Sequence, residues 1–452
     1  SYRKLAMRVL GRPLHTGGID SPRPASQRAA AFILTAAMLT TLTAPAFAGT
    51  WYIENGDITV KAGDTEGTNK VKQGDSDFVK DEGDTIITGT SNQNTVTIET
   101  EKKDDKVEVT LKDVNIDASS RNEAAVSVTG KGDTNIELDG DNKLQSGSGH
   151  AGLEHNKTDT SGELTIQDND KNGSLKAAGG QYGAGIGGAG AANDAQVKIT
   201  GGKITATGGE YGAGIGGGFK GSGDVTITGG EITSATGGKY GAGIGGGKEG
   251  RGDVTIEGNT EVNAAGGTGG AGIGGGYGAK NNSNSTGNQI TIRSNENGSP
   301  TVNAVGGGTK KGIADIGGAG IGTGSKSDAN TAITLEGKVT IKATAGKGNV
   351  AIGTNGNEQV FTGLAGGTSI TRKDSDKNDI PPLPGDNVPT PSGGDTAGGG
   401  SAGGGSAGGG STGGGSAGGD SAGGGSTGGG STGGDSTGGD STGGDSTGGD
   451  ST

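Results

Sequence analysis

Short segments in which β-branched and polar residues alternate occupy most of the chain between residues 86 and 371. Residues 225–228 (Val-Thr-Ile-Thr) and 232–234 (Ile-Thr-Ser) are two of them, and a pair of glycines separates the two. Alternation with a period of two residues, bounded by turn-forming residues, predicts short β-strands. We therefore expect an all-β fold.

These segments recur with a fixed period. The sequence Tyr-Gly-Ala-Gly-Ile-Gly-Gly occurs at residues 182–188, 211–217 and 240–246, and its last six residues return at 270–275. A constant repeat of 29 residues with three strand-like segments is typical of solenoids, in which each repeat packs against its neighbours. The repeat predicts a right-handed parallel β-helix of about eight to nine rungs. Equivalent residues would stack, so one aliphatic ladder is expected from Ile186, Ile215, Ile244 and Ile273.

Glycine occupies every second position of the Tyr-Gly-Ala-Gly-Ile segment. If this segment is a strand, the tyrosine, alanine and isoleucine side chains point to one side and the other side is bare backbone. Glycine weakens a strand, so a glycine face indicates that either a neighbouring segment or a ligand approaches the backbone closely. A polyproline-II bundle is disfavoured, because the Val-Thr-Ile-Thr segments break the strict three-residue glycine period that it needs.

Composition and charge narrow the class of protein. The chain has 452 residues, 107 of them glycine, and only 27% are hydrophobic, which favours a thin core repeated along one axis. The net charge of −13 argues against a nucleic-acid partner, whose phosphates would be repelled. The chain has no cysteine, which excludes disulfides and cysteine-ligated metal sites.

Residues 1–48 are typical of a secretory signal peptide. Arginines precede an apolar run at residues 29–42, and an Ala-x-Ala pattern follows at residues 46–48. We expect cleavage after Ala48, export through the general secretory route, and a secreted or cell-surface location. No later apolar stretch is long enough to span a bilayer, so no membrane insertion is expected after cleavage.

The remaining chain divides by composition into four parts. Residues 49–85 are expected to form an N-terminal cap that covers the open edge of the first rung, and residues 86–371 the repeat domain. A Pro-rich linker at 372–392 follows. Residues 393–452 consist of Gly/Ser/Thr-rich units with no large apolar residue, which predicts a disordered tail.

Three stretches of the repeat domain resemble a known group of proteins. Residues 212–233 combine Gly-Ala-Gly-Ile-Gly-Gly-Gly with Asp-Val-Thr-Ile-Thr-Gly-Gly-Glu-Ile-Thr, and this resembles repeats of secreted glycine-rich surface proteins of gut Firmicutes. Residues 109–116 and 135–142 resemble early rungs of the same group. The group is similar to the clostridial carbohydrate-binding parallel β-helix family. Over roughly residues 86–350, the resemblance implies that fold, with binding of acidic plant polysaccharides and calcium.

Tyr182, Tyr211 and Tyr240 are the candidate ligand-binding residues, one per repeat. One interpretation is an aromatic strip on which sugar rings stack. The other is an aromatic ladder that fills a corner of the core, which the shared parity with isoleucine favours.

Asp224 and Asp253 are the candidate metal ligands, because they occupy equivalent Gly-Asp-Val turns. Two carboxylates one strand apart repel each other unless a cation such as Ca²⁺ lies between them. The alternative is that both are ordinary turn residues. His150 and His155 lack the spacing of a metal site, and we expect them at the surface.

The leading hypothesis is a secreted or cell-surface polysaccharide-binding protein, monomeric, with a polysaccharide or cell-surface glycan as its partner and calcium as the one possible cofactor. The alternative is a structural or adhesive stalk that presents a module beyond residue 452. A polysaccharide lyase or hydrolase is the third hypothesis. Enzymes of that kind need clustered carboxylates with Arg or Lys on one strand face, whereas the acidic residues here are scattered through turns. No catalytic residue is therefore assigned.

Overall fold

The computed structural model describes residues 49–191, 193–308 and 317–386. The predicted signal peptide (1–48), the end of the predicted linker (387–392) and the predicted tail (393–452) lie outside the described residues. The described residues form β-strands, turns and one short 3-10 helix, Ile53–Asn55, which confirms the all-β class. Within them, no helix has the length and apolar character that crossing a membrane requires.

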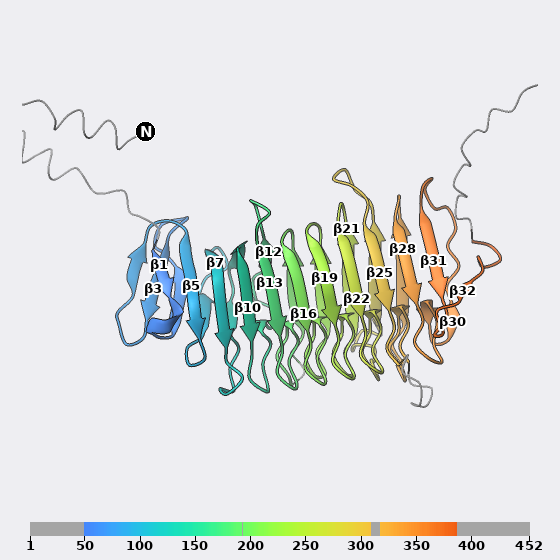
Figure 1. Ribbon diagram of the computed structural model, residues 1–452, viewed down its shortest axis with the longest axis horizontal. Helices are drawn as coiled ribbons and strands as arrows, with labels where there is room; N and C mark the ends of the chain where they lie inside the picture. The colour runs from blue at the N-terminus through green and yellow to red at the C-terminus, as the bar shows by residue number, and fades with distance from the viewer. Residues whose placement is uncertain (1–48, 192, 309–316, 387–452) are drawn as a thin grey trace, which may run out of the picture. The chain divides into compact units, whose positions relative to one another are not determined.

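The strands form two sheets, of 19 and 13 strands (Figure 1). One ladder of the first sheet contains β1 (Thr50–Tyr52), β5 (Thr85–Ser91), β7 (Lys106–Asp117), β9 (Asp133–Asp139), β12 (Leu164–Gln167), β15 (Ala195–Ile199), β18 (Gly223–Ile227), β21 (Gly252–Glu257), β24 (Asn288–Arg293) and β27 (Thr331–Glu336). The other ladder contains β10 (Asp141–Gln145), β13 (Ser174–Ala178), β16 (Lys203–Thr207), β19 (Glu231–Thr236), β22 (Glu261–Ala265), β25 (Thr301–Val305), β28 (Thr340–Thr344), β31 (Ser369–Lys373) and β32 (Asp379–Ile380).

The second sheet receives the third strand of each repeat. It contains β2 (Ile58–Ala62), β3 (Asn69–Gln73), β4 (Val79–Asp81), β6 (Val96–Thr100), β8 (Val126–Gly130), β11 (Leu153–His155), β14 (Ile186–Gly187), β17 (Ile215–Gly216), β20 (Ile244–Gly245), β23 (Ile273–Gly274), β26 (Ile321–Gly322), β29 (Ile352–Thr354) and β30 (Asn357–Glu358). Successive repeats pair in parallel in this sheet from β2 to β29.

The two ladders of the first sheet are joined at β7. Its first part pairs with β9, and its last three residues pair with β10. Asp113 lies between these parts with a φ of 51°, a left-handed conformation that lets the strand bend from one ladder into the other. Each later repeat therefore sends one strand to each of the two ladders and one to the second sheet.

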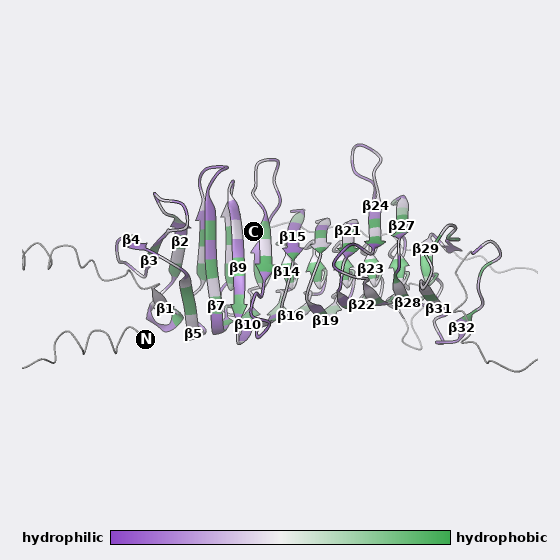
Figure 2. Cartoon of the chain, turned by 90° about the horizontal axis from the view of Figure 1, so that it is seen from above, coloured by the Kyte–Doolittle hydropathy of each residue, from purple (hydrophilic) through white to green (hydrophobic). Residues whose placement is uncertain are grey.

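The core lies inside this stack and is built from aligned aliphatic side chains. Ile186, Ile215, Ile244 and Ile273 are register partners on successive strands, and each is 0% exposed, which confirms the predicted ladder. Figure 2 shows the corresponding alternation of hydrophobic and hydrophilic residues along β7 and β9. Burial of one isoleucine side chain stabilises the fold by about 1.5–3 kcal/mol.

The glycine rows are explained by close packing of neighbouring backbone. A Cβ atom on Gly185 would lie 2.7 Å from both the carbonyl oxygen of Gly214 and the amide nitrogen of Thr207. Gly187 and its register partner Gly216 have φ values of 128° and 131°, which residues other than glycine rarely adopt. Of the two explanations for a glycine face, the structure shows the first: a neighbouring segment packs directly against the glycine backbone.

Both ends of the stack carry antiparallel strands. At the start, β1 and β2 already pair in parallel with β5 and β6, and β3 and β4 are added antiparallel beside β2. At the other end, β30 and β32 pair antiparallel with β29 and β31. Strand β31 extends to Lys373, and Arg372 is only 3% exposed, so residues from the predicted linker pack against the last repeat.

Candidate functional site

The three candidate tyrosines form a stack at the surface, which we call the aromatic column. The ring centroids of Tyr182 and Tyr211 are 5.2 Å apart and those of Tyr211 and Tyr240 are 5.5 Å apart, with interplanar angles of 10° and 11°. Tyr182 is 37% exposed and the other two are half-buried. Each tyrosine immediately precedes the Gly-Ala-Gly turn that leads into β14, β17 or β20, and the parallel register of these strands sets the column.

The expectation that these tyrosines share the buried side with isoleucine is wrong. Parity holds only along a continuous strand, and the strand β14 begins at Ile186. Residues 182–185 form a turn, so the tyrosine side chain points outward while Ala184 and Ile186 are buried. The column therefore lies at the surface, where a ligand has access to it.

A second row of side chains, Phe219, Lys248 and Tyr277, lies beside the column and was not among the predicted site residues. Phe219 contacts the rings of Tyr182 and Tyr211, with centroids 5.9 and 5.4 Å away, and Tyr277 lies edge-on to Tyr240 at 5.4 Å. The signal for this row is the same 29-residue spacing, which relates Phe219, Lys248 and Tyr277.

Lysines surround the column with positive charge. The Lys248 Nζ lies 5.4 Å from the ring centroids of both Tyr211 and Tyr240. Lys239 and Lys220 lie over Tyr240 and Phe219 at 5.0 and 5.2 Å. Such cation–π contacts contribute about 0.5–1 kcal/mol each at exposed sites. The surface thus combines apolar rings with hydrogen-bond donors.

The two histidines occupy different environments. His155 is 2% exposed and its Nδ1 lies 2.8 Å from the backbone oxygen of Gln196, so the expected surface location is wrong for this residue. Burial lowers the pKa of His155. His150 is half-buried, with its Nδ1 2.8 Å from the Oε2 of Glu154, and this hydrogen bond raises the pKa of His150. His155 is buried because its three-residue strand, β11, is packed on both faces.

Asp224 and Asp253 are register partners on the neighbouring strands β18 and β21. The Lys157 side chain forms an ion pair with Asp224, so the ammonium group of Lys157 lies beside the Asp224 carboxylate. Asp253 is exposed overall, but partial desolvation of its carboxylate and the negative charge of nearby Asp224 raise the pKa of Asp253. The tyrosines precede strands of the second sheet and the aspartates lie in the first sheet, so they form two separate candidate sites.

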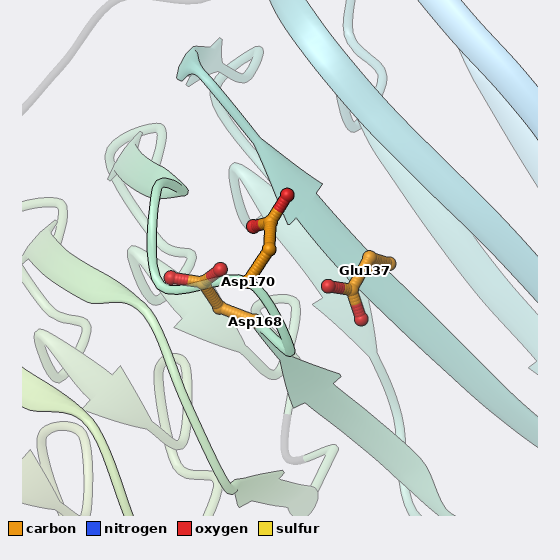
Figure 3. Close-up of side chains that lie close together, drawn as sticks. All are labelled: Glu137, Asp168 and Asp170. Carbon is orange, nitrogen blue, oxygen red and sulfur yellow. The ribbon is translucent and has the colours of Figure 1, made fainter.

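The structure also assembles an acidic group that the sequence analysis missed. Figure 3 shows Glu137 of β9 beside Asp168 and Asp170 in the turn after β12. One carboxylate oxygen from each lies within 4.8 Å of the others. The backbone N–H of Asn169 donates to Glu137 and that of Gly173 to Asp168. Oxygen donors in this arrangement suit a hard cation such as Ca²⁺, and the Asp-x-Asp-x-Asn-Gly run at 168–173 is the signal in the sequence.

Comparison with protein-family models, with curated proteins and with solved structures finds no match to this chain.

Proposed function

We propose that the repeat domain is a right-handed parallel β-helix that binds polysaccharide at the cell surface or after secretion. The β-helix is supported by three sets of parallel pairings that each receive one strand per repeat. Right-handedness is inferred from the strong preference for right-handed connections between parallel strands.

The observation that carries the binding proposal is the aromatic column. Its tyrosines repeat at regular intervals, remain partly exposed and are bordered by lysines. A row of equivalent groups suits a polymer whose own units repeat, because each repeat of the protein can make the same contact. Tyrosine offers both an apolar ring and a hydroxyl, the combination that a sugar surface requires.

A pull-down on insoluble polysaccharides and a glycan array test this proposal, using the chain without residues 1–48. We expect retention on one class of polymer without release of reducing ends, and loss of retention when Tyr182, Tyr211 and Tyr240 are all replaced by alanine. The matched control replaces the exposed aromatic residues Tyr52 and Phe78, which lie outside the column. Equal retention of the triple variant and the wild type would refute the role of the column.

The same experiment separates the other hypotheses. Retention that a chelator abolishes supports calcium, with Asp224 and Asp253 as the first pair to substitute. Release of reducing ends indicates the lyase or hydrolase. Absence of retention on every polymer leaves the structural or adhesive stalk.

Export with cleavage after Ala48 is the second part of the proposal. The backbone nitrogen of Gly49 lies 2.7 Å from the Oδ1 of Asp81, whose side chain is 4% exposed. Cleavage at this position would turn that nitrogen into an ammonium group beside a buried carboxylate, an interaction stronger than the neutral hydrogen bond. Mass spectrometry of the protein from culture medium tests this, and a mature chain that begins at another residue would refute it.

A further inference from the structure

Five successive repeats carry equivalent pairs of residues at the aromatic column. In each pair the backbone N–H of the second residue donates to the carbonyl oxygen of the first, at 2.7–2.9 Å. The pairs are Gly149 with Gly190, Tyr182 with Phe219, Tyr211 with Lys248, Tyr240 with Tyr277, and Gly269 with Ser325. The column thus ends in a glycine on both sides.

The two ends of the column differ. At Gly269 an added Cβ atom would lie 2.6 Å from Cδ2 of Tyr277, so the Tyr277 ring already fills the place beyond Tyr240. At Gly149 an added Cβ atom would meet only the Oδ1 of Asn122, at 3.6 Å. Space therefore remains at the Gly149 end, where a further aromatic ring would continue the stack.

A cavity of about 520 Å³ occupies this place. Tyr182 and Phe219 provide aromatic walls, and Gly149 and Gly190 line the cavity without side chains. Within the column the rings cover one another's faces, so the Tyr182 face opposite Tyr211 is the one turned toward this cavity. The volume lies within the range of small-molecule sites.

Fixed polar groups line the other side of the cavity. The Glu154 side chain is 9% exposed, and its Oε2 accepts hydrogen bonds from His150 Nδ1 and from the backbone nitrogen of Ala151, at 2.8 and 3.1 Å. Its Oε1 accepts one from Asn156 Nδ2 at 3.2 Å. Asn156 is itself held by the backbone nitrogen of Ala189, which donates to its Oδ1 at 2.9 Å. These groups are therefore positioned before any ligand arrives.

We propose that this cavity binds one neutral pyranose ring, stacked on the free face of Tyr182 with a ring hydroxyl donating to Glu154. This rests on the proposed function and specifies the site at which one sugar residue is recognised. A sugar matches the cavity because it has an apolar face for Tyr182 and hydroxyl donors for the carboxylate. A ligand without donors would bury Glu154 against an apolar surface, and an anionic sugar would place a second carboxylate beside it.

Saturation-transfer NMR with the full chain tests the site, with methyl β-glucopyranoside, methyl β-galactopyranoside and methyl α-mannopyranoside as probes. We expect transfer to at least one of them. Gly149→Tyr adds the missing ring of the column and should abolish this transfer. Gly366→Tyr is the matched control, because Gly366 also has open space around it, and transfer should be unchanged.

Tyr182→Ala provides a second test that does not depend on filling the cavity. It should weaken glycoside binding about fivefold to tenfold, the equivalent of one lost aromatic contact, whereas Tyr277→Ala at the opposite end of the column should leave it unchanged. Circular dichroism confirms that each variant is folded. Absence of transfer in the wild type, or equal transfer in wild type and Gly149→Tyr, would overturn the proposal. Methyl β-glucuronide is measured as an anionic fourth probe, and stronger transfer to it than to methyl β-glucopyranoside would overturn the assignment to a neutral sugar.

Polysaccharide retention of the same proteins distinguishes failure of the cavity proposal from failure of the proposed polysaccharide-binding function. A Gly149→Tyr protein that loses the glycoside but stays on the polymer supports both the cavity and the column. Glycoside binding by a wild type that no polymer retains supports the cavity and refutes the polysaccharide-binding role of the column.

Discussion

Substitution of one glycine in the middle of the stack should split its cooperative unfolding. Gly245 lies in β20 with a φ of 127°, and an added Cβ atom would lie 2.1 Å from the carbonyl oxygen of Gly274. The unfavourable backbone conformation costs about 1–3 kcal/mol, and the displacement of a packed neighbour costs about 1–3 kcal/mol more. We expect Gly245→Ala to destabilise the fold by about 2–6 kcal/mol.

The loss should be local, because each repeat contacts its neighbours alone. Trp51 is the single tryptophan and lies in β1 at the start of the stack, so its fluorescence reports on that end. Urea unfolding followed by far-UV circular dichroism reports on all strands. In Gly245→Ala we expect the circular dichroism midpoint to fall while the Trp51 midpoint remains close to that of the wild type.

Gly366→Ala is the matched control, since its added Cβ atom meets nothing within 4 Å. At a compatible glycine this change stabilises a protein by about 0.4–1 kcal/mol through the unfolded chain. Equal urea midpoints for Gly245→Ala and Gly366→Ala would refute the view that close packing of backbone requires the glycine rows. A parallel fall of both signals in Gly245→Ala would refute the local character of the loss.

Three further predictions concern titration and the two ends of the stack. In the chain without residues 1–48, NMR should find that the pKa of His150 lies above the usual value of about 6.5 and that the pKa of His155 lies below it. The stabilisation from His150 is then complete below about pH 6.5 and is lost as the pH rises through the raised pKa of His150. Equal titration midpoints for the two histidines would contradict the assigned environments. Arg372→Met should cost about 3–5 kcal/mol in thermal unfolding, because it leaves the carboxylate of Asp386, 2.6 Å from Arg372 Nη1, buried without its partner; an unchanged melting temperature would contradict this. Asp81→Leu should cost about 1–3 kcal/mol and shift tryptophan emission, because the indole N–H loses its acceptor at 2.9 Å; wild-type emission would contradict it.

Much of the fold could be predicted because its determinants repeat along the chain. The alternation within residues 225–228 and the 29-residue period gave the strands, and the isoleucine ladder followed from stacking equivalent positions. The two explanations of the glycine row remained open in the sequence, since both a neighbour and a ligand require the absence of a Cβ atom. The structure decided between them through the 2.7 Å approach of Gly214 to the position a Cβ atom would take on Gly185.

The site depended on contacts that no periodicity specifies. Tyr182 faces outward because parity is interrupted by a turn, and His155 is buried because its short strand is covered on both faces. Glu137 meets Asp168 only because parallel pairing brings the end of β9 beside the turn after β12. By itself, the sequence determined the repeat and its apolar ladder, since these depend on local alternation and a fixed period. The tertiary structure decided which polar and aromatic groups meet at the surface, because those meetings depend on turn conformation and on the register between different repeats.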